Sequence, residues 1–73
     1  MGAEVLVQVE SEAILEIDYD PANATLYVRF TDGDWYSYFD VPKRIHRAFV
    51  AADSHGRFFH DHVRDCYRYR KGR

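Results

Sequence analysis

The sequence predicts a single α+β domain: a three- or four-stranded antiparallel meander followed by two short helices packed on one face. The first observation is periodicity, because apolar residues recur at every second position up to residue 39 and at helical spacing after Pro42. The second is Pro42 itself, since proline ends a central strand and suits the first turn of a helix. The third is length, because 73 residues form only one core.

The first two strands follow from the alternation of side chains. A short strand is predicted where valines occupy alternate positions: Val5, Val7 and Val9. Residues 13–20 predict a half-buried strand, because alternate side chains fall on opposite faces. Its apolar face carries Leu15, Ile17 and Tyr19. Its polar face carries Glu16, Asp18 and Asp20.

Two turns delimit the next two strands. Residues 21–25, PANAT, contain the proline and asparagine typical of turns, and residues 26–30 follow as a strand. The apolar face of that strand carries Leu26, Val28 and Phe30. The DGD segment at 32–34 predicts a hairpin turn, because Asp-Gly readily takes positive φ. The next strand runs from Trp35 to Phe39.

Two helices are predicted after Pro42. The first has an apolar stripe at helical spacing, formed by Val41, Ile45, Ala48, Phe49 and Ala52. Its opposite side carries three bases: Lys43, Arg44 and Arg47. Residues 53–56, DSHG, break the chain, and Ser54 is suited to cap the second helix. We expect the buried stripe of the second helix to contain Phe58, Phe59, His62 and Val63.

The expected core combines the apolar faces of these elements. It contains Ile17, Leu26, Val28, Phe30, Ile45, Phe49 and Phe59. Aromatic residues make up 16% of the chain, and each ring can bury about 150–250 Å², which suits so small a core. After the second helix, tyrosines alternate with bases in the tail CYRYRKGR, a pattern more typical of a strand than of a helix.

Composition narrows the class of protein. The longest apolar run has five residues, Ala48–Ala52, far short of a membrane span. The first ten residues lack the basic region of a secretory signal. The single cysteine, Cys66, excludes an intramolecular disulfide and fits a reducing compartment. We therefore expect a cytoplasmic protein without a membrane partner.

No metal, cofactor or catalytic site is expected. Four histidines, Asp61 and Cys66 raise the question of zinc; the histidines are His46, His55, His60 and His62. However, residues two apart diverge by about 200° on a helix, and no C-x-x-C pair accompanies them. A Cys66 nucleophile would need an enclosed active site, for which so short a chain leaves little room. We therefore expect no enzyme.

The formal net charge of −2 conceals a polarity. Residues 1–40 carry nine acidic groups and only Arg29 as a base, whereas residues 41–73 carry nine bases and three acids. The two halves can neutralise each other, within the fold or between two copies. Alternatively, the second half forms a basic face for a polyanion. The sequence leaves both interpretations open.

The segment 32–42, DGDWYSYFDVP, holds four aromatic residues within five positions. On a strand, Tyr36 and Tyr38 face one way, and Trp35, Ser37 and Phe39 face the other. Exposed tyrosines would stack on bases, at about 1–3 kcal/mol per base. Tyrosines that point inward would be structural, with hydroxyls at the rim of the core. Ser37 favours this second arrangement, since an isolated serine is a poor core residue.

Four short motifs in order, YSY, FDVP, SHGRFF and YRY, resemble the KTSC domain family. That family is named for a C-terminal appendage of some lysyl-tRNA synthetases and also occurs as small free-standing bacterial proteins. The resemblance covers about 9–69 of a single domain, 1–73, with a basic tail at 70–73. It implies an association with tRNA and therefore RNA binding. It maps the family's tyrosine motif onto Tyr36 and Tyr38 and its Ser-x-Gly step onto Ser54 and Gly56.

Two functional hypotheses follow. The first is a non-enzymatic module that binds RNA or tRNA through a basic helix face and exposed aromatics. The start of the second helix, SHGR, would add backbone N–H groups for a phosphate, although an ordinary capped turn has the same composition. The second hypothesis is a protein-interaction or homodimerisation module. The site expected for RNA comprises Lys43, Arg44, Arg47, Ser54, Gly56, Arg57, Tyr36, Tyr38, Arg68 and Arg70.

Overall fold

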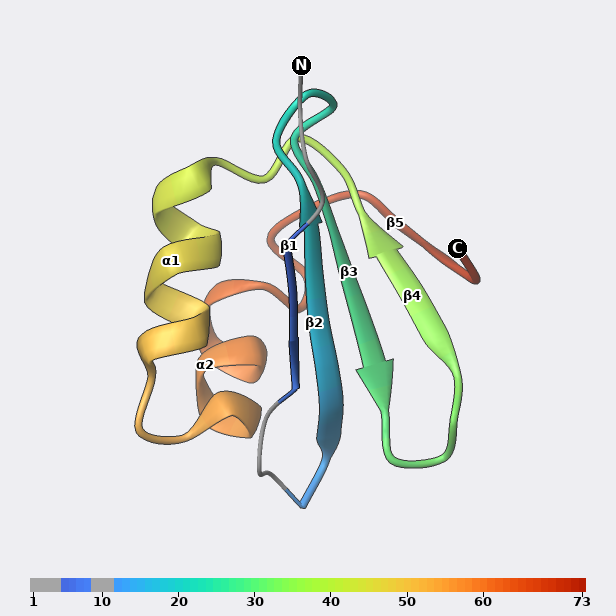
Figure 1. Cartoon of the computed structure of the whole chain (residues 1–73), viewed down its shortest axis with the longest axis vertical. Coiled ribbons are helices and arrows are strands. Elements are labelled where there is room, and N and C mark those ends of the chain that lie inside the picture. The colour runs from blue at the N-terminus through green and yellow to red at the C-terminus, as the bar shows by residue number, and fades with distance from the viewer. Residues whose placement is uncertain (1–4, 9–11) are drawn as a thin grey trace.

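The structure is a computed structural model that describes residues 5–8 and 12–73 (Figure 1). Its elements are β1 (Val5–Gln8), β2 (Ile14–Asp20), β3 (Thr25–Phe30), β4 (Trp35–Tyr38), α1 (Lys43–Ala51), α2 (His55–His62) and β5 (Tyr69–Lys71). The strands lie in chain order in one sheet, and each neighbouring pair is antiparallel. The predicted meander followed by two helices is confirmed, and the tail adds a fifth strand at the edge.

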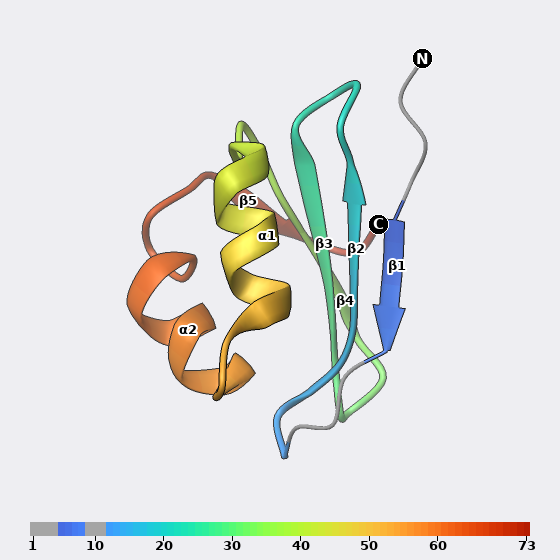
Figure 2. The ribbon, with the colours of Figure 1, turned by 60° about the vertical axis from the view of Figure 1, so that its left-hand side comes forward.

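Both helices cover the same face of the sheet (Figure 2). We call this the inner face. Cross-strand pairing places Ile17, Val28 and Tyr36 opposite one another on it, because Ile17 pairs with Val28 and Val28 pairs with Tyr36. The outer face carries the alternate residues, among them Asp18 and Tyr27, which also pair.

The core lies between the inner face and the helices. Its buried members are Ile14, Ile17, Tyr19, Leu26, Val28, Tyr38, Val41, Phe49 and Val63. Of the predicted core, Ile17, Leu26, Val28 and Phe49 are buried. The other three predicted members are half-buried and pack against this cluster: Phe30, Ile45 and Phe59. The apolar periodicity therefore identified the correct faces.

Two details of the predicted strands differ. Leu15 is exposed, and Ile14 takes the buried position instead, because the pairing register shifts between Ile14 and Glu16. Such a bulge moves the side chains on one side of it to the other face. Asp18 lies on the predicted polar face but is buried. Val9, the last residue of the predicted first strand, lies outside the described residues.

The helical stripes also differ at two positions. In α1, Ala48 is exposed and His46 is buried, with its ring stacked on Tyr19 at a centroid distance of 4.7 Å. In α2, His62 is exposed, although its ring lies 4.6 Å from that of Phe58. The prediction for α1 followed apolar residues alone and so passed over a histidine that packs as an aromatic ring.

The predicted turns and cap are present. Gly33, in the hairpin turn between β3 and β4, has φ of 95°, a conformation that glycine adopts without strain. The backbone N–H of Arg57 donates to the Ser54 hydroxyl at 3.2 Å, which caps α2. Within residues 5–8 and 12–73 no helix has the length and apolar character needed to cross a membrane.

Candidate functional site

Helix α1 begins without a side-chain cap. Its N-cap residue is Pro42, which makes no side-chain hydrogen bond, and no acidic residue lies in the first turn. The Pro42 carbonyl accepts the N–H of Ile45 at 3.0 Å. The backbone N–H groups of Lys43 and Arg44 donate to no residue that the structure describes. This helix start therefore presents free donors at the positive end of the helix dipole.

Three predicted bases surround this turn. Lys43, Arg44 and Arg47 are all exposed. None of them forms an ion pair with a residue in the described part of the chain. Because cations at a helix N-terminus oppose the dipole, this arrangement is unfavourable unless an anion joins it.

A hollow of about 260 Å³ lies beside the same turn, lined by Tyr19, Pro21, Lys43, His46 and Arg47. His46 is 9% exposed, and its Nε2 atom is buried without a hydrogen-bond partner. Burial lowers the pKa of His46, an effect that Asp18 opposes and Arg47 reinforces. The buried imidazole is therefore neutral at pH 7, and its Nε2 atom is enclosed without a hydrogen-bond partner.

The start of α2 lies away from this turn. Nine residues of α1 separate the two helix starts, a rise of about 14 Å, and the chain enters α2 at the far end of α1 (Figure 1). The Ser54 hydroxyl already accepts a backbone N–H. A Cβ added to Gly56 would lie 3.8 Å from the Ala13 Cβ, an ordinary contact. An anion site at Ser54, Gly56 and Arg57 stays a prediction.

Most of the tail bases form ion pairs within the chain. Arg68 pairs with Asp40 at 3.3 Å, and its guanidinium carbon lies 5.5 Å from the centre of the Phe39 ring. Lys71 pairs with Asp34 at 3.2 Å. Of the two tail residues in the expected site, Arg68 is therefore paired, while Arg70 is exposed. Part of the charge polarity is neutralised across the fold.

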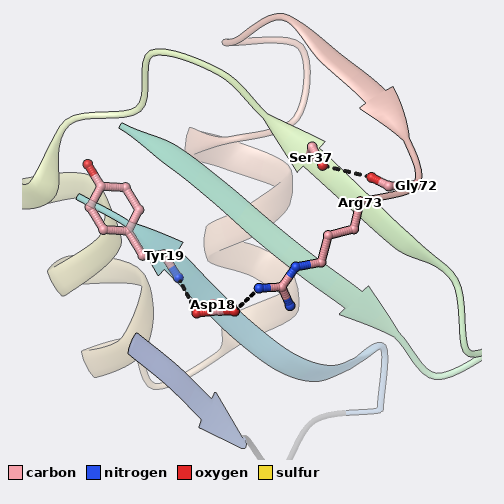
Figure 3. Close-up of polar contacts among 5 residues, drawn as sticks. All are labelled: Asp18, Tyr19, Ser37, Gly72 and Arg73. Carbon is pink, nitrogen blue, oxygen red and sulfur yellow. Dashed lines mark hydrogen bonds and ion pairs between the residues drawn. The ribbon is translucent and has the colours of Figure 1, made fainter. Parts of the chain in front are cut away.

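Arg73 completes this neutralisation on the outer face of the sheet (Figure 3). Its guanidinium contacts the Asp18 carboxylate and lies 4.2 Å from the centre of the Tyr27 ring and 4.6 Å from that of Trp35. We call these four residues the outer-face clamp. The Ser37 hydroxyl donates to the Gly72 carbonyl at 2.7 Å, which fixes the approach of the tail.

The tyrosines of the central motif point inward. Tyr36 and Tyr38 pair with Val28 and Leu26 across β3, on the face that the helices cover. Tyr38 is buried and Tyr36 is half-buried. The arrangement that Ser37 favours is therefore the observed one, and Ser37 itself is buried through its bond to the tail.

Both tyrosines also line a second hollow, of about 610 Å³. It lies near the first residues of β2, whereas the start of α1 lies near the last ones. We call it the aromatic hollow. It is lined by Glu12, Ala13, Phe30, Thr31, Asp32, Tyr36, Tyr38, Phe59, Arg64, Asp65 and Tyr69. The predicted site residues thus divide among the start of α1, the start of α2, the aromatic hollow and the tail. Sequence patterns missed Tyr19 and His46 because a core tyrosine and a lone histidine carry no positional signal.

The described residues, 5–8 and 12–73, hold no group of three or more histidine, cysteine or acidic side chains that could bind a metal ion. Cys66 is a free, exposed thiol.

Other bacterial proteins are similar to this chain in sequence. The family model described as the KTSC domain matches residues 10–69. A protein of Tsukamurella paurometabola is 43% identical over 60 residues, which cover 82% of this chain and 90% of that protein. An uncharacterized protein of Stutzerimonas stutzeri is 38% identical over 53 residues, covering 73% of this chain and 75% of that one.

A solved structure shares the fold. The crystal structure of a KTSC domain protein from Yersinia pestis superposes with a TM-score of 0.87 at 40% sequence identity, covering 94% of this chain and 97% of that one. The family match extends from before β2 to the first residue of β5, so it includes the aromatic hollow and the start of α1. The resemblance in the motifs is therefore confirmed: the chain belongs to the KTSC domain family.

Proposed function

We propose that this domain is a non-enzymatic binding module that takes RNA, a phosphate-bearing polyanion, on the first turn of α1. The observation that carries the proposal is the uncapped start of α1, with free N–H groups on Lys43 and Arg44. A phosphate oxygen accepts such N–H groups and is stabilised by the positive end of the helix dipole. A bound phosphate thus offsets the unfavourable charge of this turn.

The surrounding side chains extend this site along a strand of phosphates. Lys43, Arg44 and Arg47 supply three unpaired cations on one end of the helix. His46 lines the adjoining hollow together with Lys43 and Arg47. RNA is also the ligand that the family resemblance implies. Tyr36 and Tyr38 face the helices, so base stacking on them is not part of this site.

The test is a titration with single-stranded RNA over a series of salt concentrations. Charge reversal of two bases together, Arg44→Glu and Arg47→Glu, should weaken binding to every RNA sequence tested. If two phosphate contacts are lost, the slope of log K against log salt should flatten by about 1.4 units. Circular dichroism of the variant verifies that it is folded.

The matched control is the double variant Arg64→Glu and Lys71→Glu, two exposed bases outside the expected RNA site. It changes the net charge by the same amount, but both residues lie away from the start of α1. We expect it to retain most of the affinity. Equal weakening in both variants would mean that binding follows net charge alone. No binding at low salt would reject the proposal and favour the protein-interaction or homodimerisation hypothesis.

A further inference from the structure

Five aromatic rings line the aromatic hollow, and each of them contacts two of the others. The ring of Phe30 lies 5.4 Å from that of Tyr36 and 5.2 Å from that of Phe59. Tyr69 lies 6.2 Å from Tyr36 and 5.6 Å from Tyr38, and Tyr38 lies 5.5 Å from Phe59. All five residues line the hollow. Aromatic ring faces carry partial negative charge, which attracts cations.

The charged groups around this hollow are mainly acidic. Glu12, Asp32 and Asp65 line it, against the single cation Arg64. No ion pair joins Arg64 to these carboxylates in the described residues. Carboxylates beside aromatic rings disfavour a phosphate and favour an organic cation. The ligand chemistry of this hollow is thus opposite to that of the start of α1.

Tyr38 supplies an unpartnered hydroxyl at this site. The residue is 4% exposed and lines the hollow, and its hydroxyl makes no hydrogen bond with any described residue. Burial, followed by the neighbouring Tyr36 and Tyr69, raises the pKa of Tyr38 to about 12, so the hydroxyl keeps its proton at pH 7. The oxygen of this hydroxyl is free to accept a hydrogen bond, so an N–H of a ligand in the hollow could donate to it.

We propose that the aromatic hollow binds a protonated alkylamine. The alkyl chain lies against the rings, the ammonium faces the rim carboxylates, and one N–H donates to the Tyr38 hydroxyl. The volume of about 610 Å³ lies within the range of small-molecule sites. The chain already holds one cation in this way, because the outer-face clamp places Arg73 between two rings and a carboxylate.

Three probes with the same butyl chain separate the contributions. Butylammonium has charge and N–H donors, butyltrimethylammonium has charge without donors, and butanol is neutral. Amide chemical shifts in an NMR titration locate and quantify binding of each. We expect butylammonium to bind most tightly, with shifts at Tyr36, Tyr38 and Tyr69, and butanol to bind roughly two- to thirtyfold more weakly.

Two variants assign the contacts. Tyr38→Phe removes only the unpartnered hydroxyl, so it should abolish the advantage of butylammonium over butyltrimethylammonium. Glu12→Gln combined with Asp65→Asn should weaken both cations and leave butanol unchanged; Asn also tolerates the positive φ of 63° at residue 65. Asp61→Asn, on α2 and outside the hollow, is the matched control and should have no effect.

A lysine side chain of a partner carries the same group as a free amine. Nα-acetyl-lysine amide is therefore titrated beside butylammonium, and the tighter of the two identifies the source. Equal binding of butanol and butylammonium would overturn the proposal, as would cation shifts confined to residues outside the hollow. Because the proposal is independent of RNA, the Arg44→Glu and Arg47→Glu variant should bind butylammonium normally.

Discussion

His46 shows how one side chain combines packing with titration. Its ring stacks on Tyr19 with an interplanar angle of 9°, while its Nε2 atom lacks a partner. The Tyr19 hydroxyl donates to the Val41 carbonyl at 2.6 Å, so the stack is anchored to the segment that precedes α1. Protonation would place a positive charge inside this packed region, which the attraction of Asp18 offsets only in part.

The stability of the domain should therefore fall in acid through His46. Its pKa is lowered in the fold, so the unfolded chain, with an ordinary pKa of about 6.5, binds the proton more readily. The contribution is complete above that value and is lost as the pH falls below it. His46→Phe keeps the stacked ring and should show a shallower loss between pH 7.5 and 5.5 in urea unfolding. The exposed His60→Gln control should follow the wild type; an unchanged slope in His46→Phe would contradict this account.

The outer-face clamp gives a second prediction at the scale of single residues. The Asp18 side chain is 4% exposed and also accepts the N–H of Tyr19 at 2.8 Å. Arg73→Ala leaves this buried carboxylate without its cation and should reduce the free energy of unfolding by about 2–3 kcal/mol. In the Asp18→Asn background the same change should cost much less, as a double-mutant cycle by chemical denaturation will measure.

Lys71→Ala is the control for that cycle. It also removes a tail cation, but its ion pair with Asp34 is well exposed, so little stability should be lost. If Arg73→Ala cost no more than Lys71→Ala, the clamp would contribute nothing to folding.

At the scale of elements, the bases in the first turn of α1 lower the stability of that helix. An acidic residue in the first turn would complement the helix dipole, yet positions 43 and 44 hold bases. Lys43→Glu should therefore raise the stability of the free domain by about 0.3–1 kcal/mol in thermal unfolding. The same change should weaken RNA binding. A variant that lost stability and kept RNA affinity would contradict both expectations.

The helices and strands could be predicted from local patterns, because the spacing of apolar residues, the turn residues and Pro42 are all visible in the sequence. The face of the sheet on which a residue lies could not be predicted where strand pairing decides it. Leu15 and Ile14 exchange roles at a bulge that only the register with β3 reveals. Sequence patterns indicated a candidate anion site at the start of α2, where Ser54 is visible as a cap, and that site stays a prediction. They did not indicate the free N–H groups of α1, which result from the side-chain cap that Pro42 lacks.

Most of the other features that could not be predicted depend on contacts between residues far apart in the sequence. Asp18 was expected on a solvated face, and its burial depends on Arg73, 55 positions further along the chain. Ser37 indicated the direction of the neighbouring tyrosines correctly, although it is buried by Gly72 rather than exposed. No local pattern carries such pairings.

For the whole molecule, the polarity of charge is resolved partly within one chain. Arg68, Lys71 and Arg73 each pair with an acid from residues 1–40. Fewer unpaired charges are therefore left to attract a second copy of the chain. Sedimentation equilibrium at low and high salt should therefore give the mass of one chain in both. A dimer that dissociates with salt would favour the interaction of acidic and basic halves between copies.

The position of the tail in the sheet determines when the fold can be completed during synthesis. Residues 69–73 leave the ribosome after both helices, yet they pair with β4 and neutralise Asp18 on β2. A nascent chain that has made α2 but not this segment has an open β4 edge and a carboxylate without its cation. Contacts of such long separation form slowly compared with local ones. The pairing of β5 with β4 and the contact of Arg73 with Asp18 can therefore form only after residues 69–73 have been made.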